Sequence, residues 1–203
     1  MLAYSSIAQA GYILIALAVG AVIVLAPGDP GARDVAVAGL LGGMLHVLMH
    51  AAMKGGAFLV VAGAESRGVA DDVESWRGLS RRMPFMAFSM TILLLSLAGI
   101  PPLGGFFSKF ILFSSAVSAM RYNPWYLALA VSGVLNSALS LYYYARVIWY
   151  MYILEPEAGA SHMQAPRSIS ASVLVSVGVV ILASFVMFFL VDYLTRAAVV
   201  FFS

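Results

Sequence analysis

The sequence has no cysteine and few charged residues. Without cysteine, the chain can form no disulfide, thiolate metal site or cysteine-ligated iron–sulfur cluster, and it has no cysteine nucleophile. We therefore expect no cofactor in this chain, and any redox centre coupled to it would lie in another chain. The net charge of +2 is too small to indicate a nucleic-acid partner.

Apolar residues are in large excess. They make up 63% of the 203 residues, charged residues make up only 10%, and the mean hydropathy is +0.97. A soluble domain of this length could not bury so much apolar surface. The composition therefore predicts an all-α integral membrane protein surrounded by lipid.

Five apolar regions are long enough to cross a bilayer, which takes about 20 residues of helix. They cover residues 7–26, 35–64, 84–120, 125–153 and 168–194. We interpret residues 1–203 as one membrane domain with about five transmembrane helices. The polar stretch 65–83 is predicted to be a cytoplasmic loop.

The third region is interrupted by the sequence GIPPLGG at residues 99–105. A hairpin between two spans is one interpretation, but the halves, of about 15 residues each, are shorter than a span needs. One broken helix fits better, because proline removes backbone donors and glycine lets the chain bend. The residues predicted to form this break are Gly99, Pro101, Pro102, Gly104 and Gly105.

The arginines predict an orientation. Stretch 65–83 contains four of them, while the opposite side has only Arg33, Arg121 and Arg196. Basic residues gather in cytoplasmic loops, which places the N-terminus in the cytoplasm and the C-terminus outside. The hairpin interpretation would invert everything after the interruption.

The only two lysines, Lys54 and Lys109, both lie in stretches predicted to be within the bilayer. A lysine at that depth costs about 2.5 kcal/mol or more, so it usually has a function. No carboxylate lies near the centre of the predicted spans, and we expect the counterions to come from outside this chain.

His46, His50 and Lys54 recur every four residues in the second span. This spacing places them on one helix face over roughly 12 Å of membrane depth. Histidine gains and loses a proton near neutral pH, so the row can relay protons. The alternative is that each histidine bonds a neighbouring helix and the lysine reaches toward an interface. We favour the relay, and no metal site, because a third protein ligand is missing.

Lys109 follows the break and has two equally supported interpretations. It lines a water cavity at the break, or it marks the end of a half-helix and reaches the interface.

Several motifs together resemble a known family. They are LAYSSIAQAGYILI (2–15), HVLMHAAMKGGAFLVVAG (46–63), RGLSRRMP (77–84), LLSLAGIPPLGGFFSKFILF (94–113) and LNSALSLYYYARV (135–147). In order and spacing they resemble the antiporter-like membrane subunits of respiratory complex I, most closely subunit N and its archaeal counterpart. The members of this family have about fourteen spans with two inverted repeats, and this chain is similar to the last five.

The resemblance implies a proton-translocating subunit of a quinone-reducing complex in a prokaryotic plasma membrane. Lys54 would lie on the central hydrophilic axis, His46 and His50 would be its relay partners, and Lys109 would exchange protons with the outer face. The implied partners are other membrane subunits, including the missing N-terminal half or an adjacent antiporter-like subunit, and membrane lipid. Two alternatives are a subunit of a multisubunit sodium or potassium/proton antiporter and a remnant that only packs between subunits.

Overall fold

The structure is a computed structural model that describes residues 1–156 and 160–200, with side chains described up to residue 186. Arg196, one of the arginines used to predict the orientation, therefore lies outside the described side chains. The helices are α1 (Leu2–Gly20), α2 (Val22–Leu25), α3 (Pro30–Glu65), α4 (Leu79–Arg82), α5 (Pro84–Ala98), α6 (Gly104–Ala119), α7 (Trp125–Tyr152) and α8 (Arg167–Val200), with a short 3-10 helix, η1 (Glu74–Trp76).

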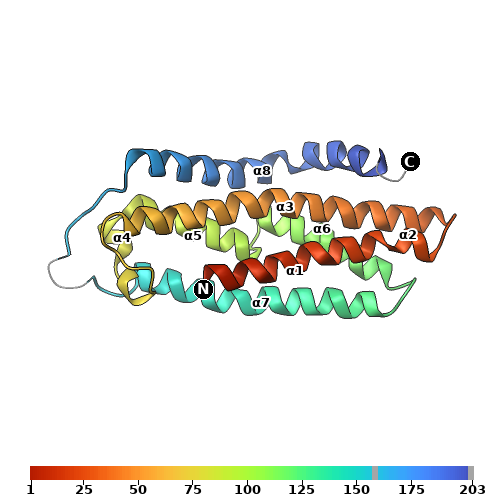
Figure 1. The fold of residues 1–203 in the computed structure, drawn as a ribbon, viewed down its shortest axis with the longest axis horizontal. Coiled ribbons are helices and arrows are strands. Elements are labelled where there is room, and N and C mark those ends of the chain that lie inside the picture. Colours follow the sequence, from red (N-terminus) through yellow and green to blue (C-terminus); the bar gives the residue numbers. More distant parts are fainter. Residues whose placement is uncertain (157–159, 201–203) are drawn as a thin grey trace.

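The helices confirm the predicted fold class of an all-α membrane protein. In the described part of the chain, four helical stretches are long and apolar enough to cross a membrane: Leu2–Leu25, Pro30–Glu65, Trp125–Tyr152 and Arg167–Val186. α5 and α6 have only 15 and 16 residues, so neither spans alone. They follow one another in the same direction along the bundle (Figure 1), which confirms one broken helix rather than a hairpin.

α3 is the central helix of the bundle. It packs against α1, α5, α6 and α8, while α7 and α8 form the two outer edges in Figure 1. Its contact with α6 is close, because a Cβ at Gly42 would lie 2.7 Å from the backbone nitrogen of Leu112. Small residues let membrane helices approach in this way, so α3 brings its polar side chains directly against α6.

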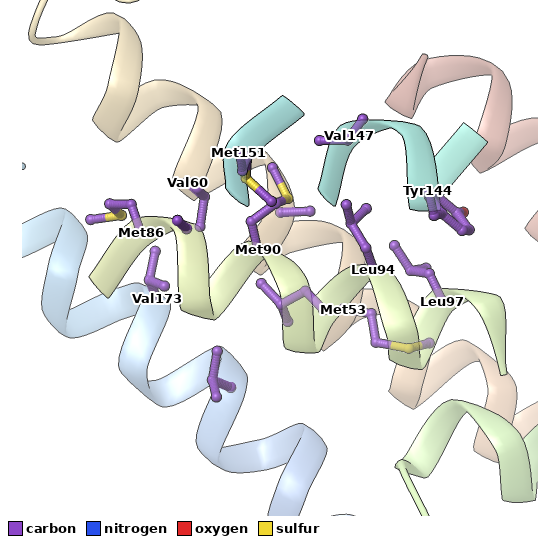
Figure 2. Close-up of a cluster of buried hydrophobic side chains, with 14 of the residues drawn as sticks. Met53, Val60, Met86, Met90, Leu94, Leu97, Tyr144, Val147, Met151 and Val173 are labelled. Carbon is purple, nitrogen blue, oxygen red and sulfur yellow. The ribbon is translucent and has the colours of Figure 1, made fainter. Parts of the chain in front are cut away.

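The largest apolar cluster surrounds α5. Figure 2 shows α5 side chains such as Met90 and Leu94 between α7, which supplies Val147, and α8, which supplies Val173. Methionine adapts to irregular gaps between helices. This cluster packs α5 against its neighbouring helices.

The break between α5 and α6 depends on glycine. Gly99 ends α5 with a φ of +86°, a conformation that favours glycine. A cis peptide bond joins Pro101 to Pro102. A Cβ at Gly105 would lie 2.0 Å from the carbonyl oxygen of Ser96, and one at Gly104 would lie 2.7 Å from the sulfur of Met49. These glycines let the two half-helices meet against α3.

Two stretches differ from the predicted limits of the spans. α3 begins before the apolar region, because Pro30 suits the first helical turn and the Asp29 carboxylate accepts a 2.9 Å hydrogen bond from the backbone nitrogen of Gly31. Stretch 65–83 contains η1 and α4, where hydropathy predicted only a loop. Hydropathy identifies lipid-facing sequence, but capping and backbone hydrogen bonds set the helix ends.

Candidate functional site

Lys54 lies in α3 and is buried, with 5% of its surface exposed. Its Nζ donates hydrogen bonds to Ser5 Oγ at 2.8 Å and to the carbonyl oxygen of Leu2 at 3.1 Å, both in α1. The Ser5 hydroxyl also bonds the hydroxyl of Tyr144, which comes from α7. Lys54 therefore points across the bundle toward α1 and does not reach an interface.

His46 lies two helical turns before Lys54 and is completely buried. One ring nitrogen, Nε2, lies 2.9 Å from Gln9 Oε1 in α1, and the other, Nδ1, lies 3.1 Å from Ser108 Oγ in α6. Because the amide oxygen of Gln9 can only accept, this contact assigns the proton to Nε2 and leaves Nδ1 as an acceptor facing the Ser108 hydroxyl, whose single proton has a second acceptor in the Gly105 carbonyl oxygen at 3.1 Å. His46 thus joins three helices through two hydrogen bonds.

His50 lies between these two residues and is half-buried. Its ring stacks on that of His46 with the centroids 6.4 Å apart. Its Nδ1 is buried and has no hydrogen-bond partner among the described residues. A buried polar atom without a partner is uncommon and calls for a water, an ion or a proton-transfer role.

Lys109 lies in the second turn of α6 and is buried, with 4% exposed. Its Nζ donates hydrogen bonds to the carbonyl oxygens of Leu97 (2.6 Å) and Ala98 (3.4 Å) at the end of α5, and to Ser137 Oγ (2.9 Å) in α7. The last carbonyls of a helix lack partners within the helix and carry partial negative charge. The lysine therefore neutralises the end of the half-helix.

An open groove of about 660 Å³ lies between α6 and α7, and Lys109 forms part of its lining. Apart from Lys109 and two serines, Ser114 and Ser137, its walls are apolar. The Lys109 Nζ lies over the face of the Tyr12 ring, which belongs to α1, at 5.1 Å from the ring centroid, and this places the two groups in a cation–π contact. Lys109 is thus buried within this chain yet borders a space that a neighbouring molecule could enter.

Gln9 connects the two lysine regions. Besides its contact with His46, its Nε2 donates a 3.4 Å hydrogen bond to the Leu97 carbonyl oxygen, which also accepts from Lys109. The polar contacts thus run across the helices through α1. Within the described residues, no hydrogen bond joins His46 to His50 or His50 to Lys54.

The electrostatic setting of the lysines is unusual. In the described part of the chain, their hydrogen-bond acceptors are carbonyl and hydroxyl oxygens, and the one ion pair, between Arg81 and Glu155, is exposed. Burying a cation among neutral partners costs several kcal/mol. Such a group responds strongly to a nearby charge or to the loss of its own proton.

Sequence reasoning placed the two lysines and two histidines but missed their partners Ser5, Gln9 and Ser108. These three polar side chains are buried in apolar helices. Ser5 and Gln9 are four residues apart in the first span, a spacing that places them on one face. That pattern was the available signal.

Comparison with known proteins identifies the chain. A family model for the membrane region of NADH:quinone oxidoreductases and Mrp antiporters matches residues 32–140, which include all four candidate residues. The chain belongs to the NADH:quinone oxidoreductase/Mrp antiporter family. The matched region covers most of α3 and all of α5 and α6, which carry the two lysines and two histidines, whereas α1, which supplies Ser5 and Gln9, lies outside it.

Curated relatives in the family carry names of respiratory subunits. F(420)H(2) dehydrogenase subunit N of Methanosarcina mazei is 44% identical over 87% of this chain and 34% of its own length. NADH-quinone oxidoreductase subunit N of Myxococcus xanthus is 36% identical over 99% of this chain and 41% of its own length. The chain therefore spans between a third and about two fifths of these relatives.

Solved structures of the family have the same fold. A chain of the Mrp complex from Dietzia aligns with a TM-score of 0.70 at 19% identity, covering 96% of this chain and 47% of that one. A chain of respiratory complex I from Thermus thermophilus with bound NADH aligns at 0.63 and 24% identity, covering 96% and 44%. The arrangement with a broken helix beside α3 thus belongs to a fold found in both kinds of complex.

Proposed function

We propose that this chain is the proton-translocating C-terminal part of an antiporter-like subunit in a quinone-reducing complex of the complex I type. The observation that carries the proposal is the pair of buried lysines, each held by neutral oxygens, on either side of the His46–Gln9 contact. The relatives named subunit N favour this class of complex over a cation antiporter. Electron transfer would take place in other chains of the assembly.

In this proposal, Lys54 and Lys109 alternate between protonated and neutral forms. Protons pass between the two lysines by way of His50 and His46. The hydroxyls of Ser5, Ser108 and Tyr144 provide further donor and acceptor sites. Gln9 and the Leu97 carbonyl hold the geometry, because an amide and a carbonyl do not exchange protons as readily as an imidazole or amine. Charge changes elsewhere in the complex would shift the balance between the two lysines.

The proposed partners are the remaining part of the subunit and adjacent antiporter-like subunits, which would supply carboxylates to the lysines. The groove beside Lys109 supports this, because it leaves a route to that ammonium from outside the chain. We further propose a prokaryotic plasma membrane, with the N-terminus in the cytoplasm and the C-terminus outside, from the distribution of arginine.

The test is Lys54→Ala in the assembled complex, reconstituted into proteoliposomes and supplied with electron donor and quinone. We expect the rate of proton uptake to fall about 100-fold, the scale on which a positioned proton-transfer group acts. Arg33→Ala is the matched control, since it removes an exposed cation near the start of the same helix. Unchanged pumping by a fully assembled Lys54→Ala complex would overturn the relay.

The second candidate is a sodium or potassium/proton antiporter subunit, favoured by the fold match to the Mrp complex. The same proteoliposomes separate the two functions. A sodium gradient that drives proton movement without electron donor or quinone would support the antiporter. Proton movement that requires both donor and quinone supports the respiratory complex.

A further inference from the structure

A second cavity, of about 550 Å³, lies at one end of the bundle between the first turns of α5 and α8. Both helices begin at this end (Figure 1), and the segment leading into α8 closes one side. Neither Lys54 nor Lys109 lines the cavity. The proton function uses none of the residues that line it.

One wall of this cavity is apolar. Phe85 from α5 and Leu174 from α8 line it and are 40% and 59% exposed, with the buried Met86 beside them. Both helices belong to the membrane-spanning bundle. These exposed side chains therefore form a slot suited to a hydrocarbon chain.

The other side of the cavity carries the cation of Arg167. Arg167, the first residue of α8, and His162 both line it and are exposed. The part of the lining that the structure describes includes no aspartate or glutamate. Basic side chains where an apolar helix begins lie at the level of lipid headgroups.

The cationic side is held in position by the rest of the fold. The backbone nitrogen of Met163 donates a 2.8 Å hydrogen bond to the carbonyl oxygen of Arg82, and Arg67 Nε donates one of 2.7 Å to the carbonyl oxygen of Gln164. These contacts fix the segment that carries His162. The side of the cavity that carries Arg167 and His162 is thus preformed.

We propose that this cavity binds an anionic phospholipid. The headgroup phosphate lies against Arg167 and His162, and an acyl chain follows the slot between Phe85 and Leu174. The apolar slot and the basic side of the cavity together favour a ligand that has both an acyl chain and a negative charge. A soluble anion would leave the apolar slot empty, and a zwitterionic lipid would bring its own cation toward the arginine.

The test uses the purified complex in nanodiscs that contain phosphatidylglycerol or phosphatidylcholine with a photoreactive acyl chain. We expect phosphatidylglycerol to cross-link to peptides containing Phe85 or Leu174 about fivefold more than phosphatidylcholine, the ratio that corresponds to the roughly 1 kcal/mol that one cation, here Arg167, contributes near a membrane surface. Arg167→Gln should remove this preference. Arg77→Gln, at an exposed arginine that does not line the cavity, should retain it.

Leu174→Trp provides a second variant, because it fills the slot and leaves both basic residues in place. It should lower cross-linking of phosphatidylglycerol even if Arg167→Gln fails to assemble. Equal labelling by the two lipids, or labelling unchanged in Arg167→Gln, would overturn the proposal. If glycerol phosphate competes as strongly as the intact lipid, the site binds an anion without using the apolar slot, and this result would also overturn the proposal.

Discussion

Lys109 and Leu97 join the two halves of the broken helix: the lysine Nζ in α6 donates a 2.6 Å hydrogen bond to the Leu97 carbonyl oxygen at the end of α5. The same carbonyl accepts from Gln9 in α1. One backbone oxygen thus links the lysine beside the break with the residue that bonds His46. Lys109 can therefore serve as a cap for the end of α5 or as a group that transfers protons. These two roles predict different effects of replacing the lysine.

Lys109→Met separates these interpretations. It removes hydrogen bonds worth about 1 kcal/mol each, but it also removes a buried cation whose desolvation costs several kcal/mol. We therefore expect the complex to assemble with a thermal midpoint no lower than that of wild type, while quinone reduction slows about tenfold if proton and electron transfer are tightly coupled. Ser137→Ala removes one acceptor of the lysine, keeps the charge and serves as the control. A large loss of stability together with a normal rate of quinone reduction would show that Lys109 acts only as a cap for the end of α5.

Gln9→Leu tests the contact between α1 and α3. It leaves Nε2 of His46 without a partner, which costs about 1–3 kcal/mol and corresponds to a 5- to 150-fold change in the population of the correctly oriented ring. We expect proton uptake by the reconstituted complex to fall within that range. Ser6→Ala is the control, because the one hydrogen bond of the Ser6 hydroxyl found among the described residues goes to the Leu2 carbonyl of its own helix. Wild-type uptake in Gln9→Leu would show that the orientation of His46 is irrelevant to transport.

Two glycine substitutions test the break. Gly105→Ala places a Cβ 2.0 Å from the Ser96 carbonyl oxygen, and we expect destabilisation by at least the roughly 1–3 kcal/mol of an overpacked core. Gly55→Ala, where no described atom outside the local backbone of α3 lies within 4 Å of the added Cβ, should instead stabilise α3 by up to about 1 kcal/mol. Thermal unfolding of the detergent-purified protein measures both. Equal midpoints would contradict the close approach of α5 and α6.

Tyr122→Phe tests a polar contact at the end of the bundle. The Tyr122 hydroxyl donates a 2.8 Å hydrogen bond to Asp29, and this bond, together with that from Gly31, lowers the pKa of the Asp29 carboxyl below its ordinary 3.8. A lowered pKa contributes stability that is present above the ordinary pKa and is lost as pH falls through the folded value.

The thermal midpoint of Tyr122→Phe should therefore lie below that of wild type at pH 6, and the gap should close as the pH falls below 3.8. Tyr4→Phe is the control, since Tyr4 is 80% exposed and none of the hydrogen bonds found in the described chain involves its hydroxyl. A gap that is constant from pH 3 to 6 would show that the carboxylate does not take part.

Much of the fold was predictable because lipid imposes a simple rule. A helix that crosses a bilayer needs a long apolar stretch, so the runs that end near Ala26, Ala64, Ile153 and Leu194 were visible as hydropathy alone. The break was also visible, since GIPPLGG cannot continue a helix between two halves too short to span. Helix ends were less predictable, because the start of α3 depends on the Asp29 cap rather than on hydropathy.

The sequence by itself determined that this is a membrane protein of helices with two costly lysines and a histidine row, because composition and helical periodicity are local properties. It could not determine their partners. Lys54 bonds α1, His46 bonds α1 and α6, and Lys109 bonds the end of α5, all of which depend on how the helices pack. Only the tertiary structure decided that the polar contacts cross between helices through Gln9, since side chains far apart in sequence meet only when close packing, as at Gly42, brings their helices together.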